Sequence, residues 1–138
     1  MAMILCIEDE VELREIITEV LEEAGYDVCV ANDGDKGLEM IHNHKPDLVL
    51  CDINMPQKDG YEVLKEIRDN HLIFADMPFI FLSALADKER VLAGLTTGAD
   101  AYLTKPINYE MLLSTVQASL RQMARIQQKH EDVITLDM

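Results

Sequence analysis

Five polar side chains follow or end short apolar runs in this sequence. Glu8 and Asp9 come directly after one run, Asp52 ends another, and Ser83 and Lys105 stand at the ends of two more. In an open parallel sheet, ligands bind beyond the carboxyl ends of the strands. If these runs are parallel strands, three carboxylates, a hydroxyl and an ammonium group meet at one edge of the sheet.

This set of side chains is suited to magnesium and to phosphoryl transfer. Carboxylates that lie close together repel, and their pKa values rise unless a cation joins them. Oxygen ligands at a hydrated site favour Mg²⁺ over zinc and softer metals. A carboxylate at Asp52 could then attack a phosphoryl group, while the metal and the Lys105 ammonium neutralise the phosphoryl oxygens.

Asp52 is the carboxylate for which a purely structural role is hardest to find. Asp9 has a structural alternative, because it is placed to cap a helix that begins at Val11. Asp52 instead interrupts the apolar run 48–53. A buried carboxylate is costly to desolvate unless it is paired or used.

The elements that position these residues alternate between strand and helix five times. Nearly all-apolar runs predict strands at 4–7, 26–31, 48–53, 79–82 and 101–103. Amphipathic spacing, with Gly and Pro at the ends, predicts helices at 11–24, 35–43, 61–68 and 88–95, and a long helix from about 109. Apolar strands of this kind are typical of a parallel sheet covered on both faces, in a doubly wound α/β fold.

Composition fits one acidic domain and excludes several classes of protein. The chain has 138 residues, a formal charge of −14 and 49% hydrophobic residues, which argues against disorder and against direct nucleic-acid binding. Its apolar runs are too short to cross a membrane, and Met1–Ile7 lacks the flanks of a signal peptide. The three cysteines show no CxxC spacing. We therefore expect a cytoplasmic protein without a membrane partner.

These motifs, in this order, resemble the receiver domain of two-component response regulators, the family of the chemotaxis response regulator. Four segments carry the similarity: 4–10 with its acidic pair, 52–60, 82–84 and 98–106. Each is weak alone, but the set is specific and extends over about residues 3–125. The resemblance implies a flavodoxin-like five-stranded parallel sheet in the order 2-1-3-4-5, with five helices and an extended last helix.

The resemblance also implies a metal site. Asp52 resembles the phospho-acceptor and a Mg²⁺ ligand. Asp9 resembles the direct Mg²⁺ ligand, Glu8 binds the metal through water, and the backbone carbonyl of Asn54 completes the protein ligands. The pair Glu8-Asp9 departs from the commoner Asp-Asp pair.

Three further residues resemble the machinery that responds to the phosphoryl group. Lys105 resembles the lysine that pairs with the phosphoryl group, and its peptide bond to Pro106 is expected to be cis. Ser83 resembles the hydroxyl that moves to the phosphoryl group. Tyr102 resembles the aromatic switch that turns inward when Ser83 moves; without the family, it reads as a half-buried core residue.

The implied function is a phosphorylation-operated switch. A sensor histidine kinase or a histidine phosphotransfer protein donates a phosphoryl group to Asp52, and the surface of the fourth helix, fifth strand and fifth helix changes to control an output domain or partner. The domain is not otherwise an enzyme, since it catalyses only its own phosphotransfer and dephosphorylation. The alternative is a degenerate receiver that acts as a phosphorylation-independent interaction module. A haloacid-dehalogenase-like phosphatase is disfavoured, because it requires a second Asp where this chain has Asn54.

The last helix extends beyond the expected receiver domain. We assign residues 1–125 to the receiver and 126–138 to an extension and tail, which leads toward an output domain or frays from Lys129. Apolar residues recur at spacings of 4, 3, 4 and 3, which is typical of a coiled-coil seam: Tyr109, Leu113, Val116, Leu120 and Met123. A homodimer through the last helices is compatible with this seam.

Overall fold

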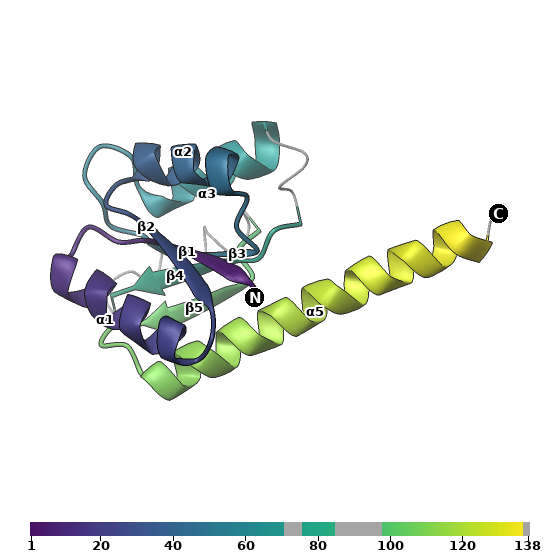
Figure 1. Ribbon diagram of the computed structural model, residues 1–138. Helices are drawn as coiled ribbons and strands as arrows, with labels where there is room; N and C mark the ends of the chain where they lie inside the picture. The colour runs from purple at the N-terminus through teal and green to yellow at the C-terminus, as the bar shows by residue number, and fades with distance from the viewer. Residues whose placement is uncertain (71–75, 85–97, 137–138) are drawn as a thin grey trace.

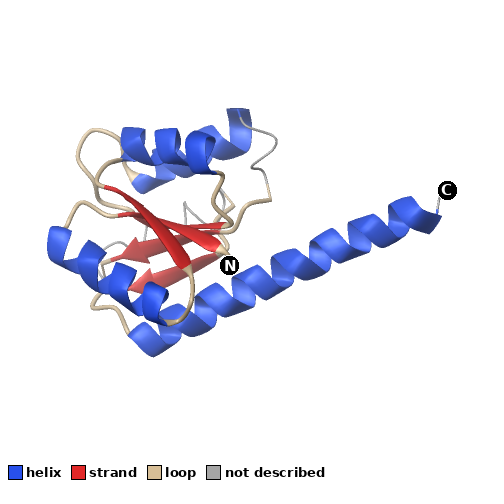
Figure 2. Cartoon of the chain, in the orientation of Figure 1, coloured by secondary structure: helices blue, strands red, loops and turns tan. Residues whose placement is uncertain are grey.

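The computed structural model describes residues 1–70, 76–84 and 98–136 of the chain. Its centre is a five-stranded parallel sheet in the order β2-β1-β3-β4-β5 (Figure 2). The strands are β1 (Met3–Ile7), β2 (Asp27–Ala31), β3 (Leu48–Asp52), β4 (Phe79–Ser83) and β5 (Ala101–Thr104). This confirms the predicted flavodoxin-like fold and its strand order.

Helices cover both faces of the sheet (Figure 1). The described helices are α1 (Val11–Glu23), α2 (Gly34–His44), α3 (Gly60–Asn70) and α5 (Tyr109–Leu136). Helices α2 and α3 pack on one face, and α1 and α5 pack on the other. The helix predicted over 88–95 lies outside the described residues.

Two apolar layers explain why the strands lack polar alternation. Successive strand residues point to opposite faces of a sheet. In β1, Leu5 and Ile7 join the layer under α2 and α3, whereas Ile4 and Cys6 join the layer under α1 and α5. Because both layers exclude water, both sets of positions are apolar.

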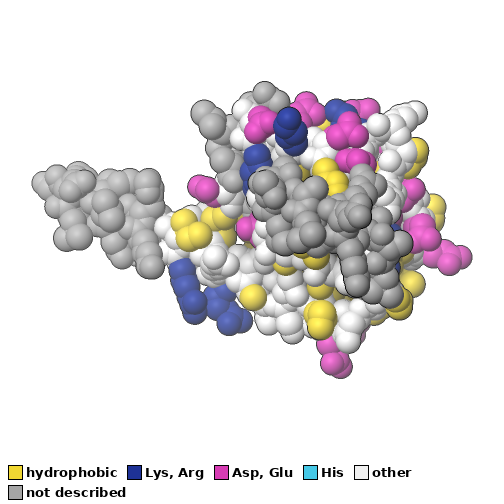
Figure 3. Space-filling view, turned by 180° about the vertical axis from the view of Figure 1, so that it is seen from behind, with side chains coloured by type: hydrophobic (Ala, Val, Ile, Leu, Met, Phe, Trp, Pro, Cys, Tyr) yellow, Lys and Arg dark blue, Asp and Glu magenta, His cyan; other side chains and the backbone are white. Residues whose placement is uncertain are grey.

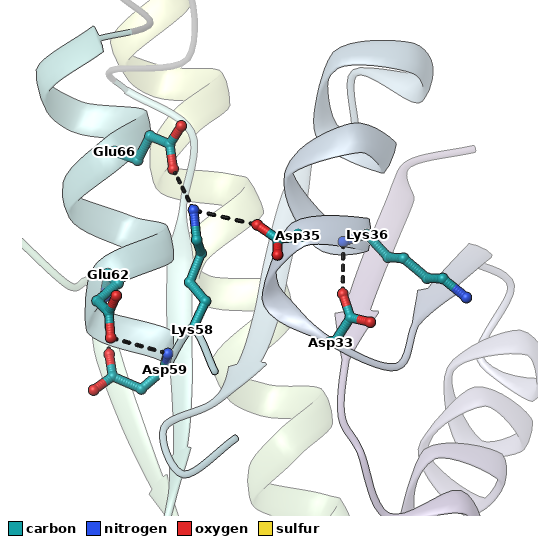
Figure 4. Close-up of polar contacts among 7 residues, drawn as sticks. All are labelled: Asp33, Asp35, Lys36, Lys58, Asp59, Glu62 and Glu66. Carbon is teal, nitrogen blue, oxygen red and sulfur yellow. Dashed lines mark hydrogen bonds and ion pairs between the residues drawn. The ribbon is translucent and has the colours of Figure 1, made fainter. Parts of the chain in front are cut away.

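A lysine in the loop after β3 links the two helices on the α2–α3 face (Figure 4). The Lys58 ammonium lies 3.3 Å from Asp35 Oδ1 on α2 and 3.0 Å from Glu66 Oε2 on α3. Asp33 caps α2 by accepting a hydrogen bond from the Lys36 N–H. Lys58 therefore connects the start of α2 to the middle of α3.

Two alternatives that the sequence left open at the helix ends are wrong. The chain does not fray from Lys129, because α5 continues to Leu136 and projects beyond the sheet (Figure 1). Asp9 does not cap α1: the cap residue is Glu10, without a side-chain hydrogen bond. The Asp9 carboxylate instead belongs to the acidic cluster described below. None of the described helices has the length and apolarity that a membrane crossing requires.

Candidate functional site

The carboxyl ends of the strands bring the predicted acidic residues together. Glu8 and Asp9 directly follow β1, and Asp52 is the last residue of β3. One carboxylate oxygen of each residue lies within 4.8 Å of the others. Glu8 is fully buried and Asp52 is 4% exposed, whereas Asp9 is exposed to solvent. The cluster is therefore open to water at Asp9 and closed to water around Glu8 and Asp52.

A single ammonium group is paired with the two buried carboxylates. Lys105, directly after β5, places its Nζ atom 2.9 Å from Glu8 Oε1 and 3.3 Å from Asp52 Oδ1. Burial lowers the pKa of the Lys105 ammonium, but the two carboxylates outweigh this effect and the pKa is raised overall. Lys105 therefore stays charged in the site.

Negative charge exceeds positive charge in this cluster. Burial raises the pKa of Glu8 from 4.5 to about 8, with Lys105 opposing the rise and Asp52 adding to it. Burial likewise raises the pKa of Asp52, and Lys105 opposes that rise. A divalent cation would relieve this repulsion. The donor set consists of carboxylate oxygens, which Mg²⁺ prefers, so the residues fit that ion.

Backbone hydrogen bonds orient the two buried carboxylates. The Asn54 N–H donates to Asp52 Oδ1 at 3.3 Å, and the Glu10 N–H donates to Glu8 Oε2 at 3.3 Å. The guanidinium of Arg14, on α1, donates to the Glu8 carbonyl at 2.9 Å. The first turn of α1 therefore helps to hold the peptide that carries Glu8. Arg14 was not singled out from the sequence, because a surface arginine carries no signal of this contact.

Ser83 and Lys105 are joined through the backbone. Ser83 ends β4 and is 3% exposed. Its carbonyl accepts a hydrogen bond of 2.7 Å from the Lys105 N–H. The Lys105–Pro106 peptide bond is cis, as predicted. The ends of β4 and β5 are thereby held together beside Asp52.

Tyr102 lies on the same side of the sheet as α2 and α3. It pairs in register with Phe81 of β4, and the two ring centroids are 5.5 Å apart. The residue is half-buried, but its hydroxyl oxygen is inaccessible to solvent. The hydroxyl end of the ring therefore points into the protein.

Sequence reasoning placed Tyr61 only as one apolar position of a helix. In the structure, its ring contacts Phe81 with a centroid separation of 4.9 Å and an interplanar angle of 67°. Gly60, just before it, brings α3 against the end of β3: a Cβ atom there would lie 2.5 Å from the Asp52 carbonyl oxygen. The sequence signal that could have indicated this contact is an aromatic residue directly after the loop glycine.

Comparison with known proteins agrees with this geometry. The family model of the response regulator receiver domain matches residues 4–117. The DNA-binding dual master transcriptional regulator RpaA of Synechocystis sp. is 38% identical over 136 residues, which cover 97% of this chain and 56% of that protein. The chain thus spans about half the length of this curated relative, and 45% of the length of ycf27 from Guillardia theta.

Solved structures of similar length show the same fold. The receiver domain of the Francisella response regulator 1452 has a TM-score of 0.81 and 32% identity, and the match covers 89% of this chain and 99% of that one. A CheY-like receiver domain protein from Methanospirillum hungatei has a TM-score of 0.84 and 30% identity, with 91% and 98% covered. The acidic cluster, the lysine after β5 and these similarities lead to one conclusion: the chain belongs to the response regulator receiver domain family.

Proposed function

We propose that this receiver domain is a phosphorylation-operated switch in which Asp52 accepts the phosphoryl group. The observation that carries the proposal is the pairing of buried Asp52 with the Lys105 ammonium at 3.3 Å, beside Glu8 and Asp9. Among these carboxylates, Asp52 is the one that ends a central strand. Its carboxylate lies beside both the acidic pair and the Lys105 ammonium, which suits a nucleophile that must meet a doubly charged phosphoryl group.

The proposed reaction is a transfer from a phosphohistidine or a small phosphodonor. An Asp52 carboxylate oxygen attacks phosphorus, the bond from phosphorus to the donor atom breaks, and the leaving group keeps the electron pair and takes up a proton. Lys105 then pairs with the phosphoryl oxygens instead of the free carboxylates. The Ser83 hydroxyl, at the end of β4, donates to a phosphoryl oxygen.

The metal of the proposed site is Mg²⁺. Asp9 and Asp52 would hold it directly, with the Asn54 carbonyl, and Glu8 would bind it through water. When bound, the ion neutralises charge on the transferring phosphoryl oxygens. Glu8 is fully buried and its carboxylate is closer to Lys105 than Asp52 is, so its role includes holding the lysine in place.

Phosphorylation would shift a conformational equilibrium in which Ser83 and Tyr102 both change position. The acyl phosphate draws Ser83 toward it, and Tyr102 fills the space that Ser83 leaves. The surface formed by the predicted helix over 88–95, β5 and α5 then favours a different partner. The size of this shift is limited by the difference in phosphoryl contacts between the two conformations.

The partners follow from this switch. We propose a sensor histidine kinase or histidine phosphotransfer protein as donor, in the cytoplasm, and an output domain or separate protein as target. Residues 1–125 form the receiver, and residues 126–138 are the helix extension and tail that lead toward the output. On the face shown in Figure 3, basic side chains lie along the part of α5 that leaves the body. Ile126 in this part is 48% exposed, which supports pairing of the last helices in a homodimer.

A degenerate receiver that works without phosphorylation is the alternative. It is disfavoured because burying two carboxylates beside one lysine costs desolvation free energy. Binding of a phosphoryl group accounts for that cost, whereas a phosphorylation-independent module does not. Intact-protein mass after incubation with Mg²⁺ and acetyl phosphate separates the two functions. The switch gives one phosphoryl adduct, which is lost with a chelator and in Asp52→Asn. The alternative gives no adduct in the folded wild-type protein.

A further inference from the structure

Three aromatic side chains form a continuous row on the α2–α3 face of the sheet. Phe81, fully buried on β4, lies in the middle. Tyr61 of α3 meets it edge to face at 4.9 Å between centroids, and Tyr102 of β5 meets it at 5.5 Å. Aromatic pairs at these separations stabilise each other beyond the effect of burial alone. Movement of Tyr102 therefore disturbs contacts that reach α3.

The row is attached to the phospho-acceptor at its α3 end. Gly60 donates its N–H to the Ile53 carbonyl at 3.0 Å. A Cβ atom on Gly60 would lie 2.5 Å from the Asp52 carbonyl oxygen and 2.8 Å from Phe81 Cε1. The first turn of α3 is thus in close contact with the backbone of Asp52. Tyr61, the next residue, has little freedom to move independently of that backbone.

Both ends of this row carry a buried hydroxyl group, and the Tyr61 hydroxyl acts electrostatically on that of Tyr102. Both hydroxyl oxygens are inaccessible to solvent. Burial raises the pKa of the Tyr102 phenol, and the Tyr61 hydroxyl raises it further. A buried hydroxyl is costly without a polar neighbour. Tyr61 therefore offers the inward Tyr102 ring both an aromatic contact through Phe81 and a polar group near its hydroxyl.

We propose that Tyr61 is a positioning residue that holds Tyr102 inward and links it, through the first turn of α3, to the backbone of Asp52. The inference rests on the proposed function, in which Tyr102 is the switch residue. It adds a second connection between Asp52 and Tyr102, separate from Ser83. It also predicts that the inward Tyr102 conformation is populated before phosphorylation, so that the phosphoryl group completes a shift already favoured by Tyr61.

The first test measures the exposure of Tyr102 in the full chain without a phosphodonor. Ring carbons of labelled tyrosine are observed by NMR in the presence of a neutral gadolinium chelate, which attenuates exposed rings. The variants are Tyr61→Phe, which removes only the hydroxyl, and Tyr61→Leu, which removes the ring. Tyr109→Phe is the matched control, because Tyr109 packs against the opposite face of the sheet.

We expect Tyr61→Phe to raise the outward population of Tyr102 roughly fivefold, the effect of one lost buried polar contact, and Tyr61→Leu to raise it further. The control leaves Tyr102 unchanged. Equal attenuation of Tyr102 in wild type and both Tyr61 variants would overturn the inference. A loss of fold in Tyr61→Leu does not affect this outcome, because Tyr61→Phe preserves the ring and its packing.

The second test asks whether Tyr61 acts through Tyr102. The rate of adduct formation with acetyl phosphate is measured for Tyr61→Phe, Tyr102→Phe and the double variant. We expect Tyr61→Phe to slow the reaction roughly threefold in the wild-type background and to have no further effect beside Phe at position 102, because residues that act through a shared partner, here Phe81, are not additive. The same slowing in both backgrounds would show a structural role only and overturn the inference. If wild type forms no adduct, the proposed function fails, and the NMR result alone decides the role of Tyr61.

Discussion

Replacing Glu8 with Gln should stabilise the metal-free protein, and the gain should grow as the pH rises. The pKa of Glu8 is raised from 4.5 to about 8, chiefly by burial. Between these values the folded protein binds a proton that the unfolded chain releases. The free energy of unfolding of wild type is therefore highest below the lower value and falls as the pH increases toward the upper one. Gln cannot ionise, so the variant lacks this loss.

The pKa difference sets the magnitude. At about pH 7, the difference between the pH and the unfolded-state pKa of 4.5 sets a ceiling of about 3 kcal/mol on the gain. Hydration at the open edge of the sheet screens the site, so we expect a gain of about 2 kcal/mol. At about pH 4.5 and below the expected gain is near zero, because Glu8 then binds its proton in the unfolded chain as well as in the folded protein.

Urea denaturation followed by circular dichroism, with a chelator present, measures this effect at about pH 5 and about pH 8. Glu15→Gln is the matched control: it removes the same charge from an exposed position of α1. Saturating Mg²⁺ should reverse the advantage of the Glu8 variant, since a ligand that binds the folded state stabilises it. A gain that is the same at both pH values would refute the argument that ionisation of the buried Glu8 carboxyl destabilises the metal-free protein.

Three further substitutions test the packing around the site. Gly60→Ala places a Cβ atom 2.5 Å from the Asp52 carbonyl oxygen and should lower the free energy of unfolding by about 2 kcal/mol in denaturant titrations; an unchanged midpoint would exclude the close contact. Arg68→Met removes hydrogen bonds to two backbone carbonyls and the 3.3 Å ion pair with Asp100. A clear fall in melting temperature, equivalent to about 2 kcal/mol, is expected, and a melting temperature equal to wild type would argue against this bridge. Lys58→Met breaks two partly exposed ion pairs and should change stability by less than about 1 kcal/mol. A large loss would mean that the loop after β3 depends on this lysine.

The fold was predictable because each element has a distinct pattern. The continuous apolar runs of β1, β3 and β4 could only be buried on both faces, and Gly25 and Pro46 separate helices from strands. The extent of α5 was not predictable in the same way. From Lys129 onward the sequence is polar, and its helical state depends on continuation from the packed part of α5.

The candidate site was predictable as a set of positions but not as a set of contacts. Topology alone places Glu8, Asp52 and Lys105 at one edge. Lys105 lies closer to Glu8 than to Asp52. This difference depends on side-chain length and rotamer, which the sequence pattern does not specify. The missed role of Tyr61 has a similar cause: an aromatic at helical spacing indicates burial, but not which ring it meets.

The most direct test of the claim that Asp52 accepts the phosphoryl group is to locate that group on the chain. The full chain is incubated with Mg²⁺ and acetyl phosphate, treated with borohydride, and digested. Reduction converts an aspartyl phosphate to homoserine, which peptide mass spectrometry locates. The account predicts homoserine at position 52 in wild type, and none there when a chelator is added or in Asp52→Asn. Homoserine at another position, or its absence throughout a folded wild-type protein, would contradict the assignment of Asp52 as the phospho-acceptor.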